Sequence, residues 1–259
     1  MRLSLAVFLL IAAPALAEPV TLIAHRANYE LTLDKVRPGS NVTAVRGTMA
    51  YEVTDACDGW AVRQRLEMLL SNRDGNSVQM VSDYLTWESK DGSKLRFRMK
   101  QTSNAAVTEQ VEGDADLAAP GGTGEVRYSQ PEGKVMPLPA GTLFPMAHTA
   151  AIIAAAETGK KFLTLPLFDG TGAEGAQNTS VFVSSWNGPS AAPYPDLADL
   201  ASGRVRVAFF SRTKEAQQPD YEVGMRYWAD GVADALNMDF SDFVVNGKLA
   251  SFTIPAPHC

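Results

Sequence analysis

The sequence predicts an all-β protein with one main helix, in which a single, strongly curled antiparallel β-sheet, a β-spiral or open half-barrel, wraps the helix. Three observations predict this fold class. Apolar and polar residues alternate over most of the chain, turn dipeptides such as Asp74-Gly75 and Asp91-Gly92 separate the alternating segments, and one alanine-rich segment breaks the pattern. Period-two alternation is typical of half-buried strands, and Asp-Gly supplies the positive φ that tight hairpins need.

The strands are predicted in thirteen segments. In one of them Leu95, Phe97 and Met99 alternate with basic residues, as expected of a strand with one face in the core. Further turn dipeptides lie at residues 58–59, 169–170, 187–188, 230–231 and 246–247. The predicted strands span residues 26–36, 42–55, 60–72, 77–88, 93–103, 106–117, 124–130, 161–168, 179–186, 203–213, 219–228, 233–242 and 243–254. So many strands cannot lie flat in one open sheet, because twist accumulates and large sheets curl, split or close.

The helix is predicted from Leu143-Phe144-Pro145 to Thr158-Gly159. Alanine dominates this segment, proline stands in its first turn and glycine follows its end. This pattern is typical of helix boundaries. Because the surface of the helix is small and nearly uncharged, we expect it to be buried on most sides, against the concave side of the sheet.

The first seventeen residues have the features of a secretory signal peptide. Arg2 precedes an apolar run from Leu5 to Ala13, and Ala15-Leu16-Ala17 provides a small-residue cleavage site. The alternative, a membrane anchor, requires about 20 apolar residues. We therefore expect cleavage after Ala17, residues 18–259 as a single domain, and a soluble product outside the cytoplasm without a transmembrane segment. A lipid-anchored N-terminus is not expected, since the nearest cysteine is Cys57.

Composition and charge exclude several functional classes. The chain has 259 residues, 46% of them hydrophobic, and 23 Lys and Arg against 29 Asp and Glu give a formal net charge of -6. An acidic chain offers no global positive field to phosphate backbones, so nucleic-acid binding is not expected. Two cysteines and three histidines are too few for a cysteine and histidine zinc site or an iron–sulfur cluster. No metal and no cofactor is predicted.

Export would place the two cysteines in an oxidising compartment. Oxidising compartments form and keep disulfides, so Cys57 and Cys259 are expected to pair with each other. The alternatives are a free reactive thiol or a bridge between two molecules. A bridge within the chain would hold a C-terminal strand that otherwise frays.

Candidate functional residues are few. The nucleophile elbow G-x-S-x-G, the P-loop and the zinc helix H-E-x-x-H are absent from the sequence. His148, next to the predicted helix start, is expected to be a satisfied structural histidine, and the alternative is a polar anchor at the mouth of a cavity. Aromatic residues such as Tyr29 and Trp60 lie on predicted strands and could line a concave apolar groove. His148, Trp60 and Tyr29 are the candidate cavity residues.

One pair of neighbouring strands is strongly charged. The first bears Lys94, Arg96, Arg98 and Lys100, and the second bears Glu109, Glu112, Asp114 and Asp116. We favour cross-strand charge pairing on a solvated face, because opposite charges across a hairpin attract. The alternative is a docking surface for an acidic partner or for lipid headgroups.

Several short motifs, in their order and spacing, resemble the EipB-like family of cell envelope integrity proteins of alphaproteobacteria. They are the segments His25 to Leu31, Gly47 to Glu52 leading to Cys57-Asp58-Gly59-Trp60, Leu143 to His148, Phe168-Asp169-Gly170, Asp239 to Phe243, and Pro257-His258-Cys259. The resemblance covers essentially the whole mature chain. It implies a periplasmic protein with a spiral-like sheet around a helical element, a family disulfide at Cys57 and Cys259, a role in keeping the envelope intact under stress, and no catalytic residues.

The resulting functional hypothesis is a non-enzymatic periplasmic protein that supports envelope integrity. It would bind either a protein partner or an apolar ligand such as a lipid in the concave face of the sheet. One alternative is a periplasmic carrier of lipids or lipoproteins, which rests on analogy between folds alone. A second alternative is an envelope hydrolase with a site assembled around His148, for instance with Asp169.

Overall fold

The computed structural model describes residues 20–212, 218–257 and 259. The predicted signal peptide, residues 1–17, and its cleavage site after Ala17 lie outside these residues. Among the residues described, no helix combines the length and the apolar character needed to cross a lipid bilayer.

The described chain forms one sheet of fourteen antiparallel strands and one α-helix. The strands are β1 (His25–Val36), β2 (Val42–Asp55), β3 (Gly59–Asn72), β4 (Ser77–Ser89), β5 (Lys94–Ser103), β6 (Ala106–Leu117), β7 (Gly124–Gln130), β8 (Val135–Leu138), β9 (Phe162–Leu167), β10 (Gln177–Val183), β11 (Ser202–Phe210), β12 (Tyr221–Trp228), β13 (Ala233–Asp239) and β14 (Phe243–Thr253). The helix α1 spans Pro145–Glu157, and a short 3-10 helix spans Pro195–Leu197.

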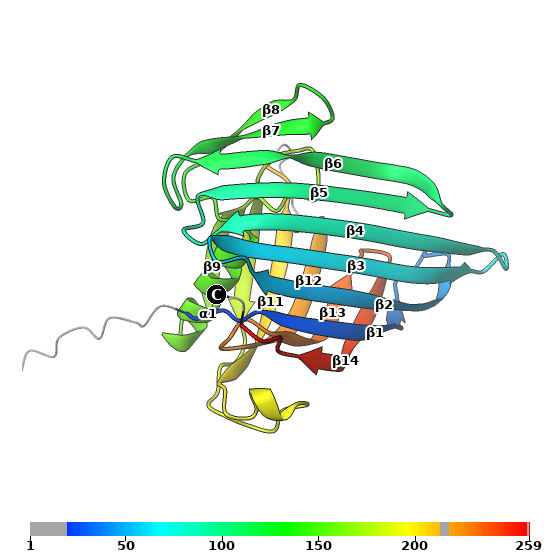
Figure 1. The fold of residues 1–259 in the computed structure, drawn as a ribbon. Helices are drawn as coiled ribbons and strands as arrows, with labels where there is room; N and C mark the ends of the chain where they lie inside the picture. Colours follow the sequence, from blue (N-terminus) through cyan, green and yellow to red (C-terminus); the bar gives the residue numbers. More distant parts are fainter. Residues whose placement is uncertain (1–19, 213–217, 258) are drawn as a thin grey trace, which may run out of the picture.

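The strand order explains the curled shape. Strands β1 to β8 pair in sequence, strands β9 to β14 do the same, and β1 pairs with β14, so that β8 and β9 are the two edges. Figure 1 shows the early strands running across the front of the molecule, with β14 beside β1 at the lower edge and β11 and β12 crossing behind the front strands at a steep angle. The predicted fold class, a single curled antiparallel sheet with one main helix, is confirmed.

Two large hydrophobic cores and a small one, formed by Val53, Val62 and Met146, occupy much of the concave side of the sheet. The larger core contains buried residues of β1–β3 and β10–β14, together with Ile152 of α1. The smaller of the two large cores lies under β5–β8, and Phe168 is at its centre. The ring of Phe168 meets the ring of Phe97 edge to face, with centroids 5.3 Å apart. Phe144 and Phe168 belong to the segments beside α1 and β9, so these segments help to fill the space between the two edges of the sheet.

Backbone contacts hold these filling segments in place. Leu143 donates to the carbonyl of Pro166, N to O 2.9 Å, and the backbone of Phe168 donates to Leu143, 3.0 Å. From the opposite side, the Tyr128 hydroxyl of β7, the neighbour of edge strand β8, donates to the carbonyl of Gly172, 3.3 Å, and accepts from the backbone N–H of Gly175, 3.2 Å. The loop that follows edge strand β9 therefore reaches β7, next to the other edge of the sheet.

The helix forms where the sequence predicts it. Its N-cap residue, Phe144, makes no capping hydrogen bond with its side chain, and the helix ends before Gly159, which has φ +76°. Six of its residues are buried: Met146, His148, Ile152, Ile153, Ala155 and Ala156. The helix lies at one end of the curled sheet (Figure 1).

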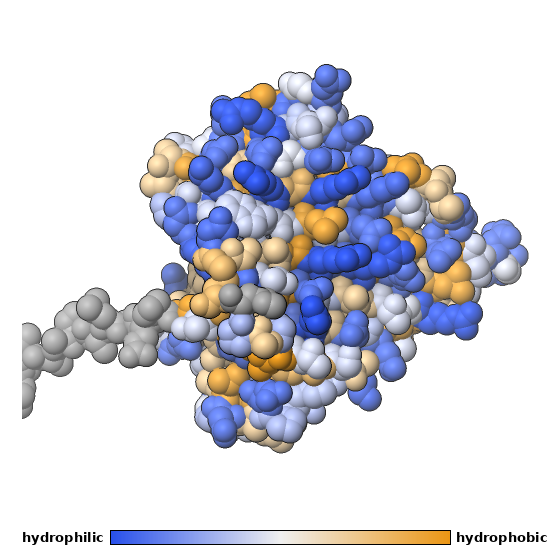
Figure 2. All heavy atoms as spheres, in the orientation of Figure 1, coloured by the Kyte–Doolittle hydropathy of each residue, from blue (hydrophilic) through white to orange (hydrophobic). Residues whose placement is uncertain are grey.

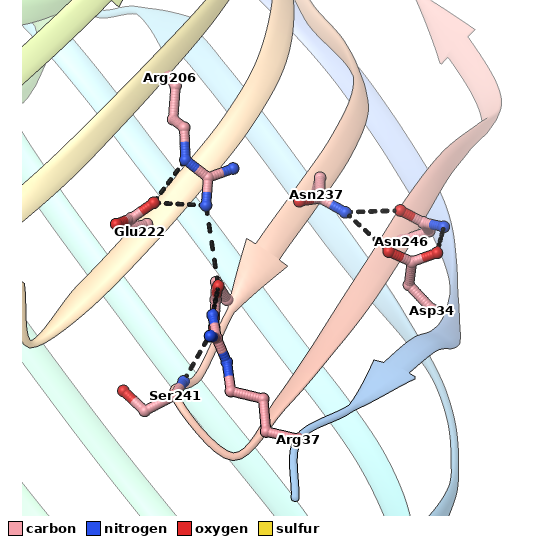
Figure 3. Close-up of polar contacts among 8 residues, drawn as sticks. Asp34, Arg37, Arg206, Glu222, Asn237, Ser241 and Asn246 are labelled. Carbon is pink, nitrogen blue, oxygen red and sulfur yellow. Dashed lines mark hydrogen bonds and ion pairs between the residues drawn. The ribbon is translucent and has the colours of Figure 1, made fainter.

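A polar network on the convex face fastens the first strand to the last ones (Figure 3). Asp239, at the end of β13, is buried and forms ion pairs with Arg37, just after β1, and with Arg206 of β11. The backbone N–H of Ser241 donates to the same carboxylate, 3.1 Å. In addition, Asp34 of β1 accepts from the side-chain amide of Asn246 of β14, 3.0 Å. These contacts span the pairing of β1 with β14 that joins the two halves of the sheet.

The charged strands pair across their hairpin. Arg96 and Arg98 of β5 lie 3.5 Å from Asp114 and 3.7 Å from Glu112 of β6, and Asp116 is paired with Arg127 of β7 at 3.5 Å. These side chains are exposed, and Figure 2 shows hydrophilic residues over much of this face. Glu109 differs from the other acidic residues of β6 because its odd position, like that of buried Val111, turns it to the concave side.

The two cysteines form the expected disulfide. Cys57 lies in the turn between β2 and β3, and Cys259 follows β14, with Cα atoms 5.5 Å apart. The bond therefore links the first half of the sheet to the segment after its last strand.

Several features of the fold differ from the sequence prediction; strands β11 and β13, for instance, end at Phe210 and Asp239 rather than at residues 213 and 242. The edge strand β8 is not among the predicted strands; it contains Pro137, which an edge strand tolerates since its outer N–H groups need no partner. Strand β10 ends at Val183 rather than at residue 186. Asn246-Gly247, which has the sequence of a turn, lies inside β14, where a Cβ on Gly247 would approach Leu236 to 3.0 Å and Leu31 to 3.2 Å. The glycine there permits close packing of neighbouring side chains.

Candidate binding clefts on the concave face

Two adjoining clefts open on the concave side of the sheet. The first cleft has a volume of about 280 Å³ and the second about 380 Å³. These volumes lie near the lower end of the range for small-molecule sites, about 300–1,000 Å³. The clefts share four lining residues, Tyr51, Gln64, Thr149 and Tyr227, which therefore mark the boundary between them.

Cross-strand pairing builds one wall of the clefts. Tyr51 of β2 is opposite Gln64 of β3, Gln64 is opposite Tyr84 of β4, and Tyr84 is opposite Met99 of β5. Because side chains alternate between the two faces of a strand, residues in such a row point to the same side of the sheet. All four line one or both clefts. Strand alternation therefore places two phenols, one amide and one thioether side by side.

The opposite wall of the first cleft comes from the late strands and from the segment before β1. Ile23 of that segment donates its backbone N–H to the carbonyl of Asp230, 3.1 Å, in the turn between β12 and β13. Four methionines line the cleft: Met49, Met146, Met225 and Met238. Methionine has a flexible thioether chain and adapts to irregular apolar shapes. The first cleft is thus an apolar space with deformable walls.

The phenols that face the clefts remain protonated. Burial raises the pKa of Tyr29, Tyr51 and Tyr227 above the usual value, and for Tyr84 nearby Asp169 adds to the effect of burial on the pKa. Each phenol is therefore a neutral hydrogen-bond donor. The Tyr29 hydroxyl donates to the carbonyl of Ala233, 2.7 Å, and the Tyr84 hydroxyl donates to the carbonyl of Asp169. These bonds hold two rings of the cleft walls in place.

The second cleft carries two carboxyl groups. Asp169, in the loop after β9, accepts at Oδ1 from the backbone N–H of Thr171, 3.0 Å, and from its hydroxyl, 2.8 Å. Burial raises the pKa of Asp169, and these two hydrogen bonds oppose the rise. Glu109 is exposed at the rim of the cleft, where burial and the nearby carboxylate of Glu174 raise its pKa. Neither Lys nor Arg is among the described residues that line the second cleft.

Of the candidate cavity residues, His148 lines the second cleft and Tyr29 lines the first. The Nε2 atom of His148 lies 2.9 Å from the hydroxyl of Thr179, which donates to the carbonyl of Leu165, 2.8 Å. Nε2 therefore acts as the donor. Burial lowers the pKa of His148 to about 4, so the ring is neutral at ordinary pH. The third candidate, Trp60, lies outside both clefts, beside a neighbouring pocket, with the Lys90 ammonium 3.1 Å from its ring centroid. A binding role for these residues stays a prediction.

The geometry does not assemble His148 and Asp169 into an acid–base pair. His148 Nε2 is bonded to Thr179, and the hydrogen bonds of the Asp169 side chain go to Thr171. Within the described part of the chain, no group of three or more His, Cys, Asp or Glu residues is arranged to hold a metal ion. The clefts offer apolar surface and hydrogen-bond donors rather than a reacting pair of groups.

Sequence reasoning missed several cleft residues. Gln64 is even-numbered, as are the inward-facing Trp60 and Val62, so strand parity points to it. On β6, parity likewise distinguishes Glu109, which is odd-numbered like buried Val111, from Glu112. Glu88, buried at 2% exposure, shares the even parity of inward-facing Tyr84, but it stands in the polar run Glu88-Ser89-Lys90-Asp91, which is typical of an exposed strand end.

Comparison with known proteins places the chain in a family. The family model described as EipB-like matches residues 16–256. The cell envelope integrity protein EipB of Brucella abortus (strain 2308) is 31% identical over 256 residues, 93% of this chain and 88% of that protein. The crystal structure of a β-barrel-like protein of a domain of unknown function from Brucella abortus superimposes with a TM-score of 0.83 at 29% identity, covering 91% of this chain and 99% of the other. The chain described here is a member of the EipB-like family.

Proposed function

We propose that this protein supports the integrity of the cell envelope from the periplasm, without catalysing a reaction, by holding an apolar, lipid-like ligand in the two adjoining clefts. The observation that carries the proposal is the first cleft, an apolar space of about 280 Å³ lined by four methionines and by tyrosine rings. Concave, mostly apolar sites with a few polar groups are typical of small-molecule binding.

Two further features support the proposal. The name of the Brucella relative describes a cell envelope integrity protein. The disulfide between Cys57 and Cys259 is typical of an oxidising compartment such as the periplasm, and the predicted signal peptide would direct the chain there with cleavage after Ala17. A carrier that moves lipids or lipoproteins through the periplasm would use the same clefts.

Blocking the first cleft tests the proposal. Ala233 lines this cleft, so Ala233→Phe places a ring inside it, while the backbone carbonyl that accepts from Tyr29 is kept. The matched control is Ala50→Phe, since Ala50 is exposed and points to the convex face of β2. Each variant is exported, purified gently from the periplasm and weighed by native mass spectrometry, and bound molecules are extracted and identified. In parallel, the neutral fluorescent probe N-phenyl-1-naphthylamine is titrated.

The expected result is a stoichiometric apolar ligand on the wild type and on Ala50→Phe, and loss of both ligand and probe binding with Ala233→Phe. A wild-type protein of clean apo mass that also fails to bind the probe would overturn the proposal and favour a protein partner. Equal probe binding by all three proteins would show that the probe lies elsewhere and would likewise reject the first cleft as the site.

A further inference from the structure

The acidic groups that face the clefts have no basic counterpart among the described lining residues, and burial raises the pKa of each of them. Asp230 is the acidic residue of the first cleft, and Asp169 and Glu109 are those of the second. Among the described lining residues, neither cleft has a Lys or an Arg. The two histidines, His25 and His148, are neutral at ordinary pH, because burial lowers the pKa of each.

This one-sided charge contrasts with the outer face of the same strand. On β6, Glu112 and Asp114 point outward and are paired with Arg98 and Arg96 of β5. Glu109 points inward, and the charged group that acts on it is a second carboxylate, that of Glu174. Acidic residues of one strand are thus neutralised on the convex side and left without a cation on the concave side, in the part of the chain that the structure describes.

Asp169 is held in position from two sides. Its backbone carbonyl accepts from the hydroxyl of Tyr84 of β4, which also lines the second cleft, and its Oδ1 atom accepts from Thr171. A carboxylate fixed in this way is pre-organised, so that a ligand does not have to order it on binding. Aromatic rings stand nearby, since Tyr51, Tyr84 and Tyr227 line the same cleft. Aromatic faces attract cations through their quadrupole.

We propose that the clefts select an amphiphile with a positively charged ammonium head, which lies between Asp169 and Glu109 in the second cleft while the apolar tail passes Tyr51 and Tyr227 into the first cleft. The inference rests on the proposed function, because it requires an apolar ligand in the first cleft. It adds the charge of the ligand and the place of its head.

Three surfactants with the same ten-carbon tail separate head from tail. Decyltrimethylammonium is the cationic probe, decyl sulfate the anionic probe and decyl maltoside the neutral one. Each is titrated below its micelle concentration into the full-length mature protein by isothermal titration calorimetry. The test variant is Asp169→Asn combined with Glu109→Gln. The matched control is Asp114→Asn combined with Glu112→Gln, which removes two carboxylates from the convex side. Ala233→Phe shows which binding belongs to the clefts.

We expect the wild type to bind decyltrimethylammonium about tenfold more tightly than the neutral and anionic probes, because ion pairing with the carboxylates and cation–π contact with the tyrosine rings act on the positive head alone, and tenfold corresponds to about 1.4 kcal/mol. The preference is expected to disappear in the test variant and to persist in the control. Urea unfolding of the test variant shows whether it folds normally.

Two other outcomes have different meanings. If all three surfactants bind the wild type with equal affinity, and Ala233→Phe abolishes that binding, the inference about charge is wrong while the proposed function stands. If no surfactant binds the wild type, both fail. A preference for the cationic probe that survives in the test variant would also overturn the inference, because it would place the ammonium head elsewhere.

Discussion

The carboxylate of Glu88, near the end of β4, accepts a hydrogen bond of 2.7 Å from the backbone N–H of Met146 in the first turn of α1. Its other oxygen accepts from the N–H of Ala147, 2.8 Å. The first N–H groups of a helix have no partner within the helix, and α1 has no acidic residue in its own first turn. A strand 58 residues away along the chain supplies the capping group instead. This contact sets where the helix meets the sheet, and Met146 lines the first cleft.

Replacing Glu88 by Gln should change how stability depends on pH. Burial raises the pKa of Glu88 to about 7 in the folded protein, although the two backbone hydrogen bonds oppose the rise. An acid whose pKa is higher in the folded than in the unfolded state stabilises the folded protein while it is protonated. This contribution is complete below the unfolded-state pKa and is lost as the pH rises to the folded-state pKa. Between pH 4.5 and 7 the loss is up to about 1.4 kcal/mol per pH unit, on the order of 3 kcal/mol in all.

Urea unfolding at several pH values between 4 and 8 measures this contribution. The free energy of unfolding of the wild type minus that of Glu88→Gln is expected to fall as the pH rises through this range. The control is Glu112→Gln, since Glu112 is exposed on the convex face. A constant difference between the wild type and Glu88→Gln would show that Glu88 has the same pKa in the folded and unfolded states.

The disulfide should stabilise the fold substantially. It joins residues that are 202 positions apart, and closing a loop of that length is worth roughly 5 kcal/mol in the chain-entropy model, an upper value. We expect Cys57→Ser or Cys259→Ser to lower the free energy of unfolding by about 2–5 kcal/mol. Thermal unfolding of the wild type with and without reductant measures the effect, and the double serine variant, which has no bond to reduce, is the control. Equal melting temperatures of the wild type in both conditions would contradict this expectation.

Gly170 is expected to tolerate no side chain. It has φ +72°, and a Cβ there would lie 2.4 Å from the ring of Phe97 in the core under β5–β8. Gly170→Ala combines backbone strain with overpacking, so it should lower the free energy of unfolding by about 2–4 kcal/mol. Gly75→Ala is the matched control, since Gly75 has φ +83° but nothing within 4 Å of the added Cβ. It should lower the free energy by only about 1–2 kcal/mol. Urea denaturation compares the two, and equal losses would show that Phe97 moves aside freely.

The sequence carries enough information to predict the sheet but not the clefts. Alternation such as that of Leu95, Phe97 and Met99 reports which residues share a face, because the period of a strand is two. It also separates inward Glu109 from outward Glu112. Which faces meet is a separate matter, since Tyr51 and Tyr227 come together only when β1 pairs with β14. No local pattern encodes a pairing between the first strand and the last one.

Other features were hidden because their meaning depends on distant neighbours. Glu88 has the parity of an inward residue but the polar context of an exposed strand end, and what its buried carboxyl group binds becomes clear only when the first turn of α1 is placed over it. Gly247 follows asparagine as a turn glycine would, yet it is required by the approach of Leu236 and Leu31 from the two flanking strands. In both cases a contact with residues distant in the sequence, rather than the local sequence context, determines the environment of the residue.

His148 should contribute to stability with the opposite dependence on pH from Glu88. Burial lowers the pKa of His148 to about 4, from its usual 6.5. A base with a lowered folded-state pKa contributes stability above pH 6.5, and this contribution is lost as the pH falls toward the folded-state value, on the order of 3 kcal/mol in all. Replacement by Gln keeps a donor for Thr179 and removes the titration.

The free energy of unfolding of the wild type minus that of His148→Gln should therefore rise between pH 4 and 6.5, where the corresponding difference for Glu88→Gln falls. Because the two groups titrate in overlapping windows with opposite signs, the double variant should show a pH profile closer to that of the wild type than either single variant does. Differences that slope the same way for both single variants would show that one of the two groups is charged in the folded state.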